Sequence, residues 1–272
     1  MEKTRLKRLL LTATVALLVA TAGCSSLTGG NGANDGNGDG ASGSGYDVAG
    51  ADLDGQTLTD ATSDSVESAG SFTVETTTTF TTSQGGEEQT STSESTLRVN
   101  LDDDRGIRNQ TQTVDSGDGA QEQSTVVYTD GSTSYRKQTA QGETSYDQQD
   151  GEPQSFGGIQ PVNTAAFAQN YTGIVDGFAW EQSGSSEVDG DAVTEYSLTG
   201  EPDRDTLGLG ENATIEDASG TLYVDSDGAV RQVDIAYTVT TQQGTTSIDA
   251  TTNLSNVGST SVEEPGWLSE AS

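Results

Sequence analysis

Histidine is absent from this chain of 272 residues, and cysteine occurs only once, at Cys24. Without histidine there is no Ser-His or Cys-His catalytic pair and no imidazole ligand for a metal ion. A single cysteine excludes an intramolecular disulfide and a two-cysteine metal site. The composition does not exclude a catalytic pair of carboxylates, as in glycosidases, but among so many acidic residues no particular pair stands out. We therefore expect neither an enzyme nor a bound cofactor.

Basic residues are also scarce, since 11 Lys and Arg face 43 Asp and Glu, for a net charge of −32 at pH 7. No basic stripe is available to neutralise phosphates, so nucleic acid is not an expected partner. At molar salt the Debye length shrinks to about 3 Å, and the carboxylates no longer repel one another strongly. The composition resembles that of proteins from extreme halophiles. A disordered acidic chain is the alternative, but the patterning described below favours a folded domain.

Residues 1–23 have the order of a signal peptide, with four basic residues between positions 3 and 8 and an apolar run from 9 to 20. That run is shorter than the roughly 20 residues of a membrane-spanning helix, although an uncleaved anchor is the alternative. Thr21-Ala22-Gly23-Cys24 resembles the lipobox of bacterial and archaeal lipoproteins. The resemblance implies a lipid on Cys24 and attachment to the outer face of the cytoplasmic membrane. The pair Lys7-Arg8 does not decide between export by the general route and export by the twin-arginine route.

The rest of the chain divides into a tether and one domain. Residues 24–50 are mostly Gly, Ser, Asn and Asp, which cannot bury enough apolar surface to fold. From residue 51 to 272 we expect a single β-rich domain outside the membrane. A helix is predicted from about 54 to 69, with Asp54 or Thr57 as its cap. One or two further short helices are predicted between Pro161 and Trp180, where apolar residues recur at near-helical spacing.

Strand patterns fill most of this domain. Phe72, Val74 and Phe80 alternate with polar residues, which is typical of a half-buried strand. Asp130-Gly131 predicts a hairpin turn. Strands are expected at 72–84, 92–101, 106–114, 124–129, 132–139, 188–198, 220–224, 230–240 and 246–254. Consecutive strands joined by polar turns predict a mainly β (α+β) fold, a curved antiparallel meander or half-barrel whose concave face is covered by short helices.

Two turns are rich in carboxylates, Asp102-Asp103-Asp104 and the turn from Asp225 to Gly228. Oxygen-rich turns suit calcium, but neither completes an EF-hand loop. Asp-Gly sequences are also common hairpin turns. We favour the turn interpretation and predict no metal site.

The layout as a whole resembles two lipoprotein groups, the LolA-like and the LprG/LppX-like proteins, and also halophilic archaeal lipoproteins with the same organisation. The segment that carries most of the resemblance runs from Gly220-Thr221-Leu222-Tyr223-Val224-Asp225 through the 225–228 turn to Glu264-Pro265-Gly266-Trp267. In those families a half-open barrel holds lipids or lipidated proteins in its concave side. The resemblance implies that this chain binds or carries a lipid or another apolar ligand.

An apolar cavity needs apolar side chains to line it, and the strands here are rich in Thr, Ser and Gln. The candidate lining residues are Phe72, Phe80, Val126, Tyr135, Phe167, Phe178, Val233, Ile235 and Tyr237. The same residues suit an ordinary core. In that case the alternative is a structural or interaction protein of the cell envelope that binds no small ligand. Four Asn-x-Ser/Thr sequons are candidate glycosylation sites, at Asn109, Asn170, Asn212 and Asn253.

Overall fold

The structure is a computed structural model, and it describes residues 53–117, 119–150, 173–200 and 212–271, with positions 202, 204, 207 and 209 between the last two ranges. The predicted signal peptide, Cys24 and the tether lie outside these residues. Residues 161–172 of the predicted helical segment at 161–180 also lie outside them; residues 173–177 are helical as predicted, but the segment ends there, and residues 179 and 180 begin a strand instead.

The first described element is the helix α2 (Gly55–Ala69). Asp54 is its N-cap, because the carboxylate accepts a hydrogen bond of 2.7 Å from the backbone N–H of Thr57. A hydrogen bond from the Thr57 hydroxyl, and next the one from its backbone N–H, hold the pKa of Asp54 below its ordinary value. The helix ends at Gly70, whose φ of 72° is a left-handed conformation that glycine adopts without strain. The predicted helix and its Asp54 cap are both confirmed.

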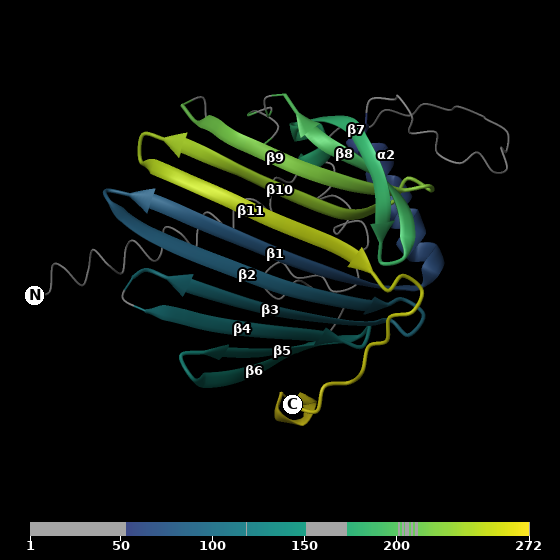
Figure 1. The fold of residues 1–272 in the computed structure, drawn as a ribbon. Coiled ribbons are helices and arrows are strands. Elements are labelled where there is room, and N and C mark those ends of the chain that lie inside the picture. The colour runs from purple at the N-terminus through teal and green to yellow at the C-terminus, as the bar shows by residue number, and fades with distance from the viewer. Residues whose placement is uncertain are drawn as a thin grey trace, which may run out of the picture. The chain divides into compact units, whose positions relative to one another are not determined.

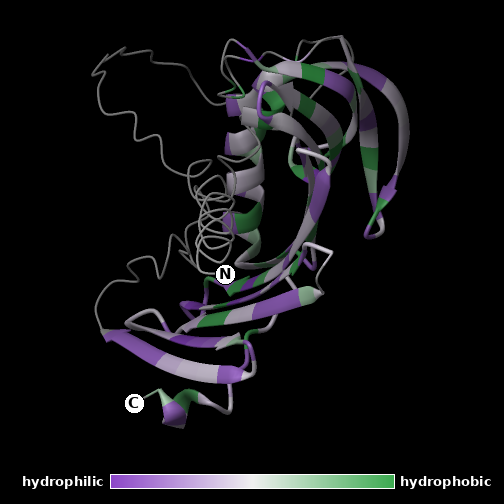
Figure 2. Ribbon diagram, turned by 90° about the vertical axis from the view of Figure 1, so that its left-hand side faces the viewer, coloured by the Kyte–Doolittle hydropathy of each residue, from purple (hydrophilic) through white to green (hydrophobic). Residues whose placement is uncertain are grey.

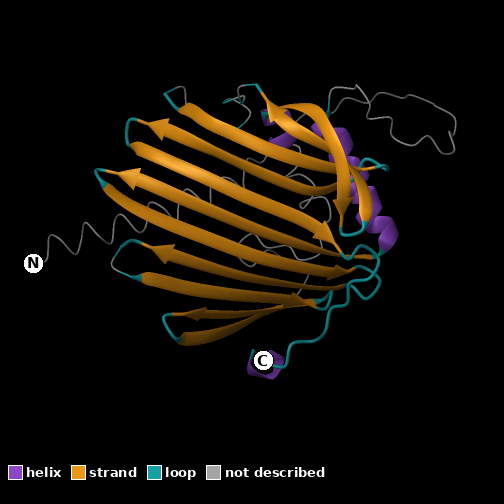
Figure 3. Ribbon diagram, in the orientation of Figure 1, coloured by secondary structure: helices purple, strands orange, loops and turns teal. Residues whose placement is uncertain are grey.

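Eleven strands form one antiparallel sheet (Figures 1 and 3). Their order across the sheet is β6-β5-β4-β3-β2-β1-β11-β10-β9-β8-β7. They are β1 (Ser71–Gln84), β2 (Glu87–Asn100), β3 (Arg105–Asp115), β4 (Ala120–Thr129), β5 (Thr133–Ala140), β6 (Glu143–Asp150), β7 (Ala179–Val188), β8 (Asp191–Thr199), β9 (Thr214–Asp225), β10 (Val230–Thr241) and β11 (Gly244–Ser255).

This order is a meander whose first and last strands pair at its centre. Strand β1 pairs with β11 from Thr73↔Ser255 to Ser83↔Thr245. Among the described residues the edges of the sheet are therefore β6 and β7, the two strands on either side of residues 151–172 in the sequence. Figure 2 shows the sheet curving around the side on which α2 lies. The predicted mainly β fold, a curved antiparallel sheet with few helices, is confirmed.

The two faces of the sheet differ, and we name them by what lies on each. On the helix face, Val66 and Leu58 of α2 join a buried cluster with strand residues such as Phe72 and Leu222. The backbone N–H of Val230 donates to the Thr62 hydroxyl at 2.9 Å, which ties α2 to the start of β10. The rest of the buried cluster comprises Val74, Val99, Val175, Tyr196, Val224, Val230, Val233 and Leu254.

The opposite face carries the C-terminal strap, residues 256–271, and we call it the strap face. The backbone N–H of Gly258 donates to the Ser71 carbonyl at 2.7 Å. The Thr260 and Thr73 hydroxyls lie 2.8 Å apart. At its far end Trp267 stacks near Tyr146 of the edge strand β6, with ring centroids 6.0 Å apart. The strap therefore connects the centre of the sheet to one of its edges (Figure 1).

Candidate ligand-binding face

The helix face carries a second apolar group, which extends beyond the cluster under α2 and meets it at Trp180. The register places Phe80 of β1 opposite Ile248 of β11, and Ile248 opposite Tyr237 of β10. These three side chains are only half-buried. The Tyr237 ring contacts that of Phe178 (centroids 5.8 Å apart), and Phe178 contacts Trp180 (6.3 Å). We call Phe80, Ile248, Tyr237, Phe178 and Trp180 the distal patch.

Phe80 of the distal patch lies well along β1 from the part of the face under α2, whereas Trp180 packs against the core cluster. Phe72, which packs in the cluster with α2, and Phe80 are eight residues apart on β1, or about 26 Å at the usual rise of a strand. Burial raises the pKa of Tyr237 above its ordinary value, so this phenol stays neutral over the physiological range. In addition, the buried Trp180 Nε1–H has no hydrogen-bond partner. The distal patch thus combines apolar surface with one unused donor.

The helix face becomes polar on strands β2 and β3. There, three side chains of β3 each donate a hydrogen bond to a serine on β2, at 3.0, 3.3 and 3.4 Å. The donors and acceptors are Arg108 with Ser95, Gln110 with Ser93, and Gln112 with Ser91. A ligand on the helix face would therefore meet apolar side chains on β1, β10 and β11, and neutral hydrogen-bonding groups and one arginine on β2 and β3.

Carboxylates are divided unequally between the two faces. On strands β1–β4 and β9–β11 the register places one carboxylate on the helix face, Glu87, at the end of a hairpin, and it pairs Asp217, at the bulge of β9, with no residue of β10. The strap face of the same strands carries Glu75, Glu88, Glu94, Asp115, Glu122, Glu216, Asp225, Asp234 and Asp249. Since burying a charge is costly unless it is paired, this arrangement leaves the helix face suited to an apolar ligand.

The predicted lining residues fall into three groups. Phe72 and Val233 are in the core cluster, and Ile235 is buried on the same face. Phe80, Phe178 and Tyr237 come together in the distal patch.

The other predicted lining residues are not at this site. The register places Val126 and Tyr135 on the strap face, where the Tyr135 ring lies 6.2 Å from that of Tyr128. Phe167 lies outside the described residues. Sequence reasoning missed Ile248, Trp180 and Arg108. Ile248 stands alone in a polar run, and only its pairing with Phe80 shows its position.

In the carboxylate-rich turn at 225–228, the carboxylate oxygens of Asp225 bind protein groups of the turn and of the strand that follows it. Asp225 Oδ1 accepts from the backbone N–H groups of Asp227 (3.0 Å) and Ala229 (2.9 Å). Asp225 Oδ2 and Arg231 Nε form an ion pair, with the two atoms 2.9 Å apart. This contact does not have the geometry of a hydrogen bond, so the buried Arg231 Nε–H has no hydrogen-bond acceptor. In the part of the chain that the structure describes, no group of three acids is arranged to hold a metal ion.

The sequons lie in different surroundings. Asn109 is exposed on the strap face, and Asn212 is exposed in the loop before β9. Asn253 is half-buried in β11, and its amide oxygen is buried without a partner. Asn170 is outside the described residues. Asn109 and Asn212 are therefore the two described sequons with an accessible side chain.

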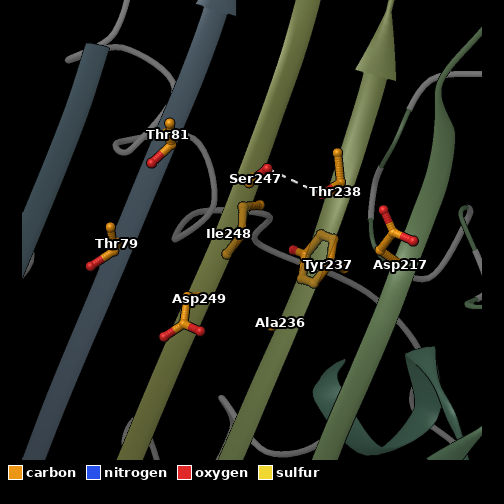
Figure 4. A pocket seen from close by; sticks show the side chains of 9 residues that line it. All are labelled: Thr79, Thr81, Asp217, Ala236, Tyr237, Thr238, Ser247, Ile248 and Asp249. Carbon is orange, nitrogen blue, oxygen red and sulfur yellow. Dashed lines mark hydrogen bonds between the residues drawn. The ribbon is translucent and has the colours of Figure 1, made fainter. Parts of the chain in front are cut away.

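A shallow open depression of about 200 Å³ crosses β1, β11, β10 and β9 (Figure 4). Its polar lining comes from the strap face and includes the hydroxyls of Thr238 and Ser247, 3.1 Å apart, and the carboxylates of Asp217 and Asp249. For neither carboxylate is a basic partner seen among the described residues. The depression has no arrangement of groups that points to a specific reaction.

These observations define a single antiparallel sheet of eleven strands, with a helix on one face and a partly exposed apolar patch beyond it. The sequence belongs to a family of unknown function (DUF7537), whose model matches residues 9–271. No curated protein matches it. Within the described residues, none of the helices is long and apolar enough to span a membrane.

Several solved structures are similar at low identity. The lipoprotein LppX of Mycobacterium tuberculosis is 10% identical, with 76% of this chain and 98% of that chain covered and a TM-score of 0.31. A putative outer membrane lipoprotein-sorting protein domain from Vibrio parahaemolyticus is 7% identical, with coverages of 78% and 96% and a TM-score of 0.26. A beta-barrel-like protein of a domain of unknown function (DUF1849) from Brucella abortus is 12% identical, with coverages of 68% and 98% and a TM-score of 0.26. These likenesses are distant.

Proposed function

We propose that this protein is a lipoprotein anchored outside the cytoplasmic membrane through Cys24, and that it binds the apolar chain of a lipid or a similar ligand on its helix face. The observation that carries the proposal is the distal patch. Phe80, Ile248 and Tyr237 lie side by side, half-buried, on three adjacent strands whose helix face carries no carboxylate. The role is binding or carriage, and no catalytic residue is assigned.

The physical basis is the transfer of apolar surface from water. Each methylene of an acyl chain buried on the patch contributes about 0.8 kcal/mol, and no carboxylate there has to lose its hydration. A contiguous, partly exposed apolar patch marks a binding surface, whereas apolar residues scattered singly over a surface are normal. The acidic strap face is consistent with a domain that works in high salt.

The two tryptophans provide the first test, because they lie in different places: Trp180 in the distal patch and Trp267 in the strap. Trp267→Phe leaves Trp180 as the sole tryptophan of the full chain, and Trp180→Phe leaves Trp267. In molar KCl, dibromostearate should quench the fluorescence of the first variant saturably and stoichiometrically, because bromine quenches only at short range. The second variant should be quenched weakly and without saturation.

Equal quenching of both tryptophans would show non-specific association and would contradict the proposal. An absence of saturable quenching at Trp180 would contradict it as well. Ala250→Phe supplies a further check, since residue 250 lies on the helix face between Ile248 and the α2 cluster. The larger side chain should reduce saturable quenching of Trp180 while leaving the unfolding transition cooperative.

The anchor is tested separately by Cys24→Ser in the native host. Since Cys24 is the only cysteine, this change removes every thiol that lipid could modify. We expect the variant to appear in the medium or to accumulate with its signal peptide uncleaved, whereas the natural chain fractionates with membranes. A mature Cys24→Ser protein that remains in the membrane fraction would refute the anchor.

A second candidate function is an interaction protein of the cell envelope. It is favoured by the edge strands β6 and β7, each of which has one side without a strand partner among the described residues. Unpaired edges accept an added strand from another protein. This role predicts no saturable lipid quenching at Trp180.

A further inference from the structure

Arg108 differs in its surroundings from the other described basic residues. It lies on the helix face of β3, directly opposite Leu97 of β2 on one side and Val127 of β4 on the other. Leu97 packs against the core cluster, and Val127 is 1% exposed. Burial in this apolar setting lowers the pKa of the Arg108 guanidinium from its ordinary value, although it stays protonated at any physiological pH.

The guanidinium of Arg108 is only partly used. Its Nε donates to the Ser95 hydroxyl at 3.0 Å, and no carboxylate among the described residues pairs with it. Arg231 and Arg136, by contrast, each pair with aspartate, Arg136 with Asp147 at 2.6 Å. Neither terminal nitrogen of Arg108 is completely buried without a partner. A half-buried arginine thus keeps a fork of N–H donors available on the helix face.

An unpaired arginine on this face is unexpected in a chain of net charge −32, where carboxylates outnumber basic residues about fourfold. A guanidinium taken partly out of water is normally compensated by an acid. The register places Glu94 of β2 and Glu122 of β4 on the opposite face, and Glu87, the one carboxylate of β2 on the helix face, is ten residues from Leu97, the partner of Arg108.

We infer that Arg108 binds the acidic headgroup, a carboxylate or a phosphate, of an amphipathic ligand whose apolar chain lies across the helix face toward the distal patch. The inference rests on the proposed function and specifies its ligand class. Planar guanidinium groups bind carboxylate and phosphate through paired hydrogen bonds. Serine and glutamine side chains that continue from Arg108 along β2 and β3 offer neutral hydrogen-bonding groups to the remaining polar atoms of the head.

The separation of the two ends supports a long ligand. Arg108 is in the same cross-strand row as Val74, two strand spacings or about 10 Å away. Phe80 lies six residues further along β1, or about 20 Å. A ligand that reaches both Arg108 and the distal patch must therefore be extended and carry its charge at one end.

The test compares two probes that share one brominated acyl chain, dibromostearate with its carboxylate and the methyl ester without it. Both are titrated into the full chain carrying Trp267→Phe, in molar KCl at pH 8, with Trp180 quenching as the readout. Arg108→Gln is added to this background, because glutamine still donates to Ser95. Arg98→Gln, on the strap face, is the matched loss of one positive charge.

With Arg108 present, we expect the carboxylate probe to bind roughly tenfold or more tightly than the ester, the usual contribution of a charge-assisted hydrogen bond. Arg108→Gln should abolish this preference and leave ester binding unchanged, and Arg98→Gln should change neither. Inorganic phosphate should weaken binding of the carboxylate probe alone.

Each other outcome is decisive. If both probes quench Trp180 saturably and equally with Arg108 present, the headgroup inference is overturned while the proposed function stands. If neither probe binds, the proposed function fails first. If Arg108→Gln weakens both probes equally with an unchanged unfolding midpoint, Arg108 shapes the face without contacting the headgroup, and the inference is likewise overturned.

Discussion

Leu222→Ala is expected to lower the free energy of unfolding by about 2–5 kcal/mol, the usual range for removing a buried leucine. Leu222 is 0% exposed in β9. The register places it between Val233 of β10 and Tyr196 of β8, and all three belong to the cluster that packs with α2. The smaller side chain removes the free energy gained by burying leucine and leaves a cavity. Because long backbone hydrogen-bond ladders hold the strands in place, the sheet can close this cavity only in part.

The measurement is urea-induced unfolding of the full chain at constant molar KCl, followed by fluorescence. Urea is required because guanidinium chloride would change the ionic strength of a highly acidic protein. Leu198→Ala is the matched control, since this leucine is only half-buried, and its loss should be clearly smaller. Equal losses at the two positions would show that Leu222 is not in a tightly packed core.

Asp225→Ala is expected to cost about 3–5 kcal/mol, as is typical when one partner of a buried ion pair is removed. The Asp225 side chain is 10% exposed and that of Arg231 is 12% exposed. The substitution leaves Arg231 with Asp191 alone, whose side chain is 55% exposed. It also removes the acceptor of the backbone N–H of Ala229, a residue that is 0% exposed.

Asp225→Asn separates these two contributions, because the amide oxygen still accepts the turn hydrogen bonds while the charge is lost. We expect it to cost less than Asp225→Ala in the same urea titration. Asp227→Ala, in the same turn but exposed, should change stability by no more than about 0.5 kcal/mol. If Asp225→Ala behaved like Asp227→Ala, the carboxylate would contribute little and the calcium interpretation of this turn would have to be reopened.

Local features of the sequence were sufficient for several elements. Asp54 predicted where α2 begins, because a side-chain oxygen at that position can accept from the N–H of residue 57. Alternation in Phe72, Val74 and Phe80 predicted β1, and Asp130-Gly131 predicted the turn before β5. The edge strands β6 and β7 were not predicted. Both consist mostly of polar residues, and an edge strand needs little apolar surface.

The candidate site was predicted less well, for a definite reason. Alternation assigns the residues of one strand to two faces but does not say which face meets α2. Val126 and Phe80 have the same character in the sequence, yet the register directs Val126 to the strap face and Phe80 to the helix face. Arg108 carried no local signal, since only its neighbours on β2 and β4 show that it is half-buried among apolar side chains.

The sequence by itself thus determined what depends on composition and on residues close in the chain: the acidic charge, the lack of histidine, the predicted lipobox at Cys24, the helix, and most of the strands. Only the tertiary structure decided the closure of the meander by β1 and β11, the separation of carboxylates from the helix face, and the meeting of Phe80, Ile248 and Tyr237. The closure, and the pairing of Phe80 with Ile248, join residues more than 160 positions apart. Short-range periodicity contains no information about such pairings.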